Sequence, residues 1–261
     1  MDRIQEILFL VLGPLAVGGT FLLSAPSLTS AGISFYRTNG IVFLVTALLG
    51  IFLGSPERSL PVFFFIAFIF ILFFYNLRLW FRHPYSSRIL LFAASAVGMI
   101  GFFIALGSFV SPLDAPLRFL FLALHASLQT LLLGAGVLAM LLGHRYLTEP
   151  TLSIVPLLFL SRIFMGLVFA EGGLALLNLI LAAQSPQVQN AILLNSFEGL
   201  YLWIRVMTGI LGPMILAPMI IKTVHERATM SATGLLYIAM LMVIIGALFS
   251  RFFLLVNPQL I

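Results

Sequence analysis

The sequence predicts an all-α, polytopic membrane protein in which a single bundle of about eight transmembrane helices occupies residues 1–261. Hydrophobic residues make up 62% of the chain and charged residues only 8%, whereas soluble domains carry about 25% charged residues. The mean hydropathy is +1.19. Apolar segments of about 20 residues, long enough to cross a ~30 Å hydrocarbon core, recur along the whole chain.

The predicted helices are separated by short polar connections in which proline and glycine are frequent, such as "SAPSLTSAG" and "SPLDAP". They span residues 6–26, 38–54, 60–80, 88–110, 117–143, 152–183, 197–221 and 231–256. No connection is long enough for a soluble domain. We expect the first segment to be a retained helix and not a signal peptide, because Asp2 and Glu6 beside Arg3 remove the positive bias of a signal sequence.

The charges of the connections predict an orientation. Seven basic residues fall on one side of the membrane: Arg37, Arg78, Arg82, Arg88, Arg145, Lys222 and Arg227. Three fall on the other side: Arg3, Arg58 and Arg118. The positive-inside rule then places both termini outside and, in a bacterium, the protein in the cytoplasmic membrane. The net charge of +5 is spread over short connections, which fits a topology signal and does not indicate nucleic-acid binding.

Several kinds of chemistry are disfavoured by composition. The chain has no cysteine, so it cannot hold a disulfide, a cysteine-ligated iron–sulfur cluster or a thiolate metal site. Its two aspartates, Asp2 and Asp114, lie in terminal or loop positions, which does not suit magnesium-dependent group transfer in the membrane. No phosphate-binding glycine loop, HExxH motif or serine-nucleophile elbow is present.

The predicted helix 152–183 carries two ionisable residues in an otherwise apolar stretch. Arg162 and Glu171 are nine residues apart, which is about 180° of rotation, so they cannot pair along one face. Since each group costs roughly 2.5–3.5 kcal/mol against lipid, we expect this helix to be central, with neighbours on both sides. Gly166 and Gly173 would allow one neighbour to approach closely on the face of Arg162, which would be a structural residue.

The neighbouring helices supply polar residues at a similar depth to Glu171. The catalytic candidate is Glu171, as the proton-handling group, and the candidate binding residues are His125, Gln129, Arg205 and Arg251. All five are expected in the half of the bilayer that contains the termini. Structural interpretations remain open: Arg251 as a residue that reaches the headgroups, Glu171 with Arg205 as an ion pair, and His125 as a packing residue.

A haem b is a less favoured alternative. It needs two facing histidines, and only His125 is deep in a predicted helix. The other candidate ligands lie at the inner edge, in short polar connections: His83, His144 and His225.

The last predicted helix contains "GALFSRFFLL" (246–255), which resembles the glycine and arginine–phenylalanine signature of quinol-handling membrane subunits of polysulfide and dimethyl-sulfoxide reductases. The resemblance covers this motif and the arrangement of eight helices in about 260 residues. It implies partner subunits that carry iron–sulfur, haem or molybdopterin centres, and a quinone or quinol pocket in the outer half. Residue roles are not transferred from that family.

The sequence therefore predicts an integral membrane subunit of a respiratory or other electron-transfer complex. Such a chain would anchor redox partners, contribute a quinone site, and be at most a non-autonomous subunit of an oxidoreductase. Two alternatives remain open: a structural scaffold subunit without chemistry of its own, and a transporter of protons or small solutes, which would also gather polar groups near the midplane.

Overall fold

The computed structural model describes residues 2–54, 59–81, 87–110, 112, 115–149, 151–182, 186–194 and 197–256. Within these ranges all regular structure is helical, and eight helices are long and apolar enough to cross a membrane. The predicted class, an all-α polytopic bundle, is confirmed.

The described α-helices are α1 (Asp2–Leu23), α2 (Ile33–Gly54), α3 (Ser59–Phe81), α4 (Ser87–Leu106), α5 (Pro116–Thr148), α6 (Val155–Ala182), α7 (Pro186–Ile192), α8 (Phe197–Val206), α9 (Gly212–His225) and α10 (Thr229–Val256). A 3₁₀ helix covers Pro26–Ala31, and a π-helical turn covers Met207–Leu211. This turn joins α8 to α9, and the three segments make one membrane span, Gly199–His225.

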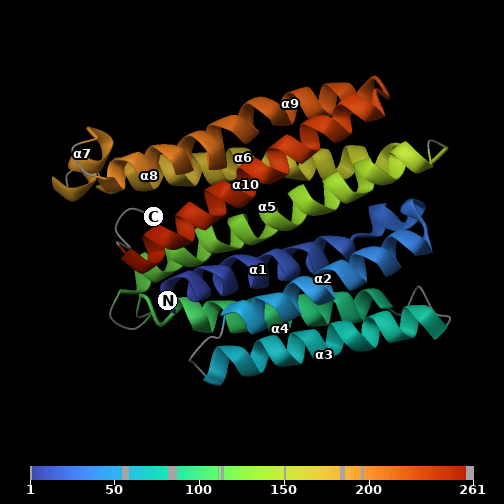
Figure 1. The fold of residues 1–261 in the computed structure, drawn as a ribbon, viewed down its shortest axis with the longest axis horizontal. Coiled ribbons are helices and arrows are strands. Elements are labelled where there is room, and N and C mark those ends of the chain that lie inside the picture. Colours follow the sequence, from blue (N-terminus) through green and yellow to red (C-terminus); the bar gives the residue numbers. More distant parts are fainter. Residues whose placement is uncertain are drawn as a thin grey trace.

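The helix α5 lies in the middle of the bundle (Figure 1). It packs against α1 on one side and against α6 and α10 on the other, and 72% of the residues in its apolar stretch are buried. Where α1 crosses α5, a Cβ on Gly18 would overlap the backbone carbonyl of Thr130, and a Cβ on Gly134 would overlap Gly18. Glycine at both positions therefore lets the two backbones touch.

Both chain termini lie at the same end of the bundle, as the number of spans requires (Figure 1). The connections between α6 and α8 lie at this end, and those between α5 and α6 and between α9 and α10 lie at the opposite end. The half of the bundle next to the termini is called the terminal half below.

Two predicted helices are longer than the sequence suggested, because their arginines are accommodated inside the helix. Arg37 lies in α2, and its Nε and Nη2 donate to the carbonyl of Leu79 at 3.2 and 2.9 Å. Arg145 lies in the last turns of α5 and pairs with Glu149, with 3.0 Å between Nη2 and Oε2. Each cation thus has an acceptor, so neither forces the helix to end.

The π-helical turn is explained by the proline that follows it. Pro213 has no backbone N–H, so the carbonyl four residues before it loses its α-helical partner. The N–H of Gly212 instead bonds to the carbonyl of Met207, five residues earlier. Such wide turns are frequent near functional sites.

The expectation that the helix containing Glu171 is central is wrong. Only 17% of the residues in the apolar stretch of α6 are buried, against 72% for α5. The buried residues Phe164, Val168 and Glu171 form one stripe at spacings of three and four. Because this stripe is the side that packs on the bundle, Glu171 lies inside, while Arg162 lies on the exposed side.

Candidate functional site

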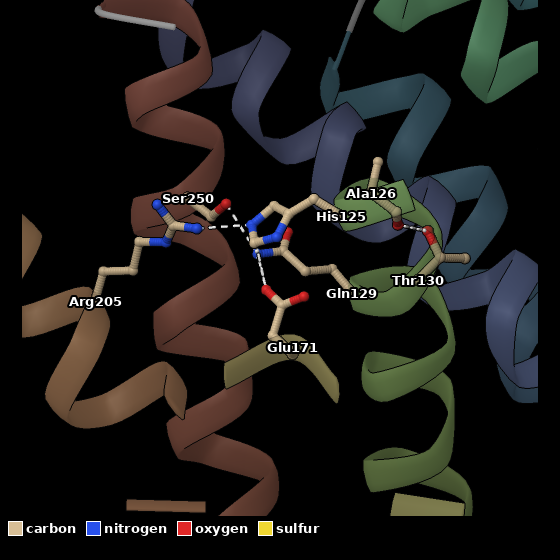
Figure 2. A network of polar contacts seen from close by, with 7 residues as sticks. All are labelled: His125, Ala126, Gln129, Thr130, Glu171, Arg205 and Ser250. Carbon is tan, nitrogen blue, oxygen red and sulfur yellow. Dashed lines mark hydrogen bonds and ion pairs between the residues drawn. The ribbon is translucent and has the colours of Figure 1, made fainter. Parts of the chain in front are cut away.

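Polar side chains from four helices meet in the terminal half of the bundle (Figure 2). His125 and Gln129 come from α5, Glu171 from α6, Arg205 from α8 and Ser250 from α10. All five are buried. They are called the polar cluster below.

The amide of Gln129 holds the cluster together. Its Nε2 donates to Oε1 of Glu171 at 3.0 Å and to Oγ of Ser250 at 2.9 Å, so this single amide links α5 to both α6 and α10. The same nitrogen also lies 3.2 Å from Nε2 of His125, so three neighbours surround the two N–H groups of this amide. Gln129 therefore fixes the position of the Glu171 carboxyl.

Nε2 of His125 has three polar neighbours. Nη2 of Arg205 lies 2.6 Å away and Nε2 of Gln129 lies 3.2 Å away. A guanidinium only donates hydrogen bonds, so Nε2 of His125 must present its lone pair to Arg205. Oε1 of Glu171 lies 3.2 Å from the same nitrogen. The geometry thus brings two titratable side chains, a carboxyl and an imidazole, into direct contact.

A close glycine contact brings Arg205 to the cluster. Gly209, in the π-helical turn, is one turn from Arg205, and Gly246 of α10 is one turn from Ser250. A Cβ on Gly209 would lie 2.8 Å from the Cα of Gly246, so these backbones touch only because both residues are glycine. This glycine pair was not predicted from the sequence, although each glycine lies four residues from a polar residue of the cluster.

Arg251 is fully buried, with 0% of its surface exposed. Its guanidinium carbon lies 5.2 Å from the centre of the Phe102 ring of α4, and its charge acts on Glu171 and Arg205. The interpretation of Arg251 as a residue that reaches the lipid headgroups is therefore wrong. Its side chain points into the protein, next to the cluster.

An apolar groove of about 540 Å³ opens beside the cluster. Among the described residues that line it, Arg205 is the only charged one. The lining comes from α6, α7, α8, the π-helical turn and α9: Phe169, Gly172, Gly173, Ala175, Leu176, Asn178, Leu179, Val188, Ile192, Leu202, Trp203, Arg205, Val206, Ile210, Leu211 and Met214. A hydrogen bond of 3.2 Å from Nε1 of Trp203 to the carbonyl of Ile192 fixes α7 against α8 at this groove.

A second, much smaller cavity lies at the cluster. Its volume is about 10 Å³, close to the minimum for one water molecule. Gln129, Glu171 and Arg205 line it, together with Ile210. Arg205 and Ile210 also line the groove. The apolar groove and the cavity at Glu171 therefore lie on either side of these two residues.

The candidate haem ligands are remote from this site. His144 is exposed near the end of α5 and lies 3.3 Å, through Nδ1, from the hydroxyl of Tyr237. His225 is exposed at the end of α9. Both lie in the half opposite the terminal half (Figure 1). His83 lies outside the described residues.

The glycine-lined face of α6 differs from the expectation. A Cβ on Gly166 or Gly173 would meet nothing within 4 Å, so the predicted close helix contact on this face is wrong. Arg162 is exposed and makes no hydrogen bond or ion pair with the described residues, so no contact among them supports the structural role expected of it. Gly173 lines the groove instead.

No protein-family model, no curated protein and no solved structure matches this chain.

Proposed function

We propose that this chain is the membrane subunit of an electron-transfer complex and binds a quinone or quinol in the groove. The observation that carries the proposal is an apolar groove of about 540 Å³ whose described lining has a single charged residue, Arg205. Arg205 contacts His125, which in turn contacts Glu171. A quinone matches this lining, because it has an apolar tail and a ring with polar oxygens. Sites of this kind use a few fixed polar groups in a mainly apolar lining.

The residues at the inner end of the groove suit two requirements of quinol oxidation: binding of a ring oxygen and transfer of a proton. Arg205 lines the groove, and a guanidinium only donates hydrogen bonds, so it is the lining residue that suits a ring oxygen. Glu171 and His125 are titratable groups 3.2 Å apart, and such a pair suits the transfer of a proton. A bound quinol would supply two electrons and two protons.

Electron carriage belongs to other subunits in this proposal. The chain has no cysteine, so the partners would hold the iron–sulfur, haem or molybdopterin centres. In a bacterial cytoplasmic membrane with both termini outside, the groove would lie in the outer half of the bilayer. The chain would then anchor its partners and be a non-autonomous part of a membrane oxidoreductase.

The scaffold function keeps one specific observation in its favour. The outward face of α6 carries Arg162, Gly166 and Phe169, all exposed, and an arginine facing lipid costs roughly 2.5–3.5 kcal/mol by insertion scales. A partner helix on this face would cover it. Because the chain has no cysteine, Gly166→Cys gives a single thiol whose cross-linking to a partner subunit tests this directly.

The quinone proposal is tested by tryptophan fluorescence. The chain has two tryptophans: Trp203 lines the groove, whereas Trp80 lies on the exposed side of α3. Decylubiquinone added to the purified subunit in a non-ionic detergent should quench Trp203 in a saturable manner. The variant Trp80→Phe should retain this saturable quenching, and Trp203→Phe should lose it. Equal and unsaturated quenching of both variants would mean that the quinone only dissolves in the micelle.

A further inference from the structure

Another groove opens between α3 and α4, where α3 ends and α4 begins, at the end of the bundle opposite the termini (Figure 1). It is called the α3–α4 groove below. Its volume of about 380 Å³ falls within the range of roughly 300–1,000 Å³ that is usual for ligand sites. Four apolar residues and one cation line it: Phe74, Leu77, Phe81, Leu90 and Arg78. A cation and room for a ligand therefore lie in one place.

Arg78 is exposed in this groove and makes no hydrogen bond or ion pair with the described residues. It lies three residues before the end of α3, which is about 4.5 Å along the helix. Phe74 and Arg78 are four residues apart and share one side of α3. Phe74 and Leu77 are exposed as well. An apolar strip thus leads from a cation near the end of the span toward the middle of the bilayer.

The sequence around Arg78 supplies cations and no counter-charge. No aspartate or glutamate occurs from residue 58 to residue 113, a range that contains all of α3 and α4, and α2 has none either. Arg37 of α2 reaches the last turn of α3, where its Nη2 donates to the carbonyl of Leu79 at 2.9 Å. Arg88 lies in the first turn of α4. Three helices therefore each place an arginine at the same end of the bundle, and α2, α3 and α4 contain no carboxylate to balance them.

We propose that the α3–α4 groove binds an anionic phospholipid, with the lipid phosphate at Arg78 and an acyl chain along Phe74 and Leu77. A guanidinium suits a phosphate because its planar N–H groups match the phosphate oxygens, and the apolar strip suits the chain. In the predicted orientation this end of the bundle is cytoplasmic, and anionic lipids are abundant in the cytoplasmic leaflet. The inference does not require a quinone in the groove beside the polar cluster.

Native mass spectrometry of the full chain in non-ionic detergent tests the inference. The protein is titrated with phosphatidylglycerol and, in parallel, with phosphatidylcholine that carries the same acyl chains. One arginine near anionic lipid corresponds to a change of about fivefold in affinity. The unaltered protein should therefore prefer phosphatidylglycerol by about fivefold or more, Arg78→Gln should weaken this binding by about fivefold, and Arg78→Lys should keep most of it.

The matched control is Arg162→Gln. It removes another exposed arginine from the same end of the bundle, seven residues from the start of α6, and Arg162 does not line the α3–α4 groove. This variant should bind phosphatidylglycerol like the unaltered protein. Equal affinity of the unaltered protein for the two lipids overturns the inference, and so does an equal loss in Arg78→Gln and Arg162→Gln.

Photolabelling of the unaltered protein locates the lipid without any substitution. Phosphatidylglycerol with a photoreactive group near the glycerol end of one acyl chain should label peptides 74–81 and 87–97. Label confined to 169–179 and 202–214 would place the lipid in the groove beside the polar cluster and overturn the inference. A partner protein is the other occupant to test. Because the chain has no cysteine, Phe74→Cys gives a single thiol, and its cross-linking to another subunit in native membranes would assign the groove to protein and overturn the inference.

Discussion

The substitution Gly246→Ala should push α10 away from the π-helical turn and thereby disturb the polar cluster. A Cβ on Gly246 would overlap the Cα of Gly209 and lie 2.9 Å from its nitrogen. Carbon atoms pack best at about 3.5–4.0 Å, so the two backbones must separate by about an ångström. Since Arg205 and Ser250 are each one turn from the contact, the separation moves Arg205 relative to Ser250.

The expected cost is about 1–3 kcal/mol, the usual range for overpacking a well-packed contact. For a chain of this size that corresponds to a fall of about 2–12 °C in the unfolding midpoint, measured in non-ionic detergent. The matched control is Gly234→Ala in the same helix, where a Cβ would meet nothing within 4 Å. If Gly246→Ala and Gly234→Ala unfold at the same temperature, α10 and the π-helical turn do not touch as described.

Three further predictions concern the site and the orientation. Glu171→Gln keeps the shape of the side chain but removes the titratable carboxyl. The complex should therefore assemble and lose quinol-linked turnover by about 100-fold or more. Normal turnover would favour a structural role for Glu171. Gly173→Leu should weaken quinone binding by about 5–150-fold without loss of stability. The control Gly166→Leu adds the same volume outside the groove and should bind quinone normally. Equal binding by the two variants would place the quinone elsewhere. Reporter fusions at Arg145 and Arg227 should give a cytoplasmic signal, and a periplasmic signal at both would reverse the orientation.

The helices and the members of the cluster were predictable because their signals are local. A stretch of about 20 apolar residues identifies a span by itself. The spacing of four between His125 and Gln129 places them on one face of a helix whatever lies around it. Glu171 and Arg251 stood out because ionisable residues are costly within a span. The structure brings these residues to one depth, as the direction of each helix indicated.

The groove and the packing of α6 could not be predicted, because they depend on which helices are neighbours. Gly166, Gly173 and Gly246 look alike in the sequence, yet only Gly246 meets another backbone, and Gly173 lines the groove. Arg162 was expected to need a second neighbour for α6, but the described bundle leaves that side exposed. The sequence shows a polar Ser250 next to Arg251, but it does not predict the hydrogen bond of Ser250 with Gln129, because that bond depends on the packing of α10 against α5.

The central claim is that a quinone binds in the groove with its ring next to Arg205. Photolabelling with an azido-substituted quinone, followed by peptide mass spectrometry, tests it most directly. The structure offers a second apolar pocket as an internal comparison: about 220 Å³, between α1, α4 and α5, lined by residues that include Phe21 and Phe92. The proposal predicts label on 169–179 and 202–214, and less label in the Gly173→Leu variant. Label confined to the peptides that contain Phe21 and Phe92 would contradict it.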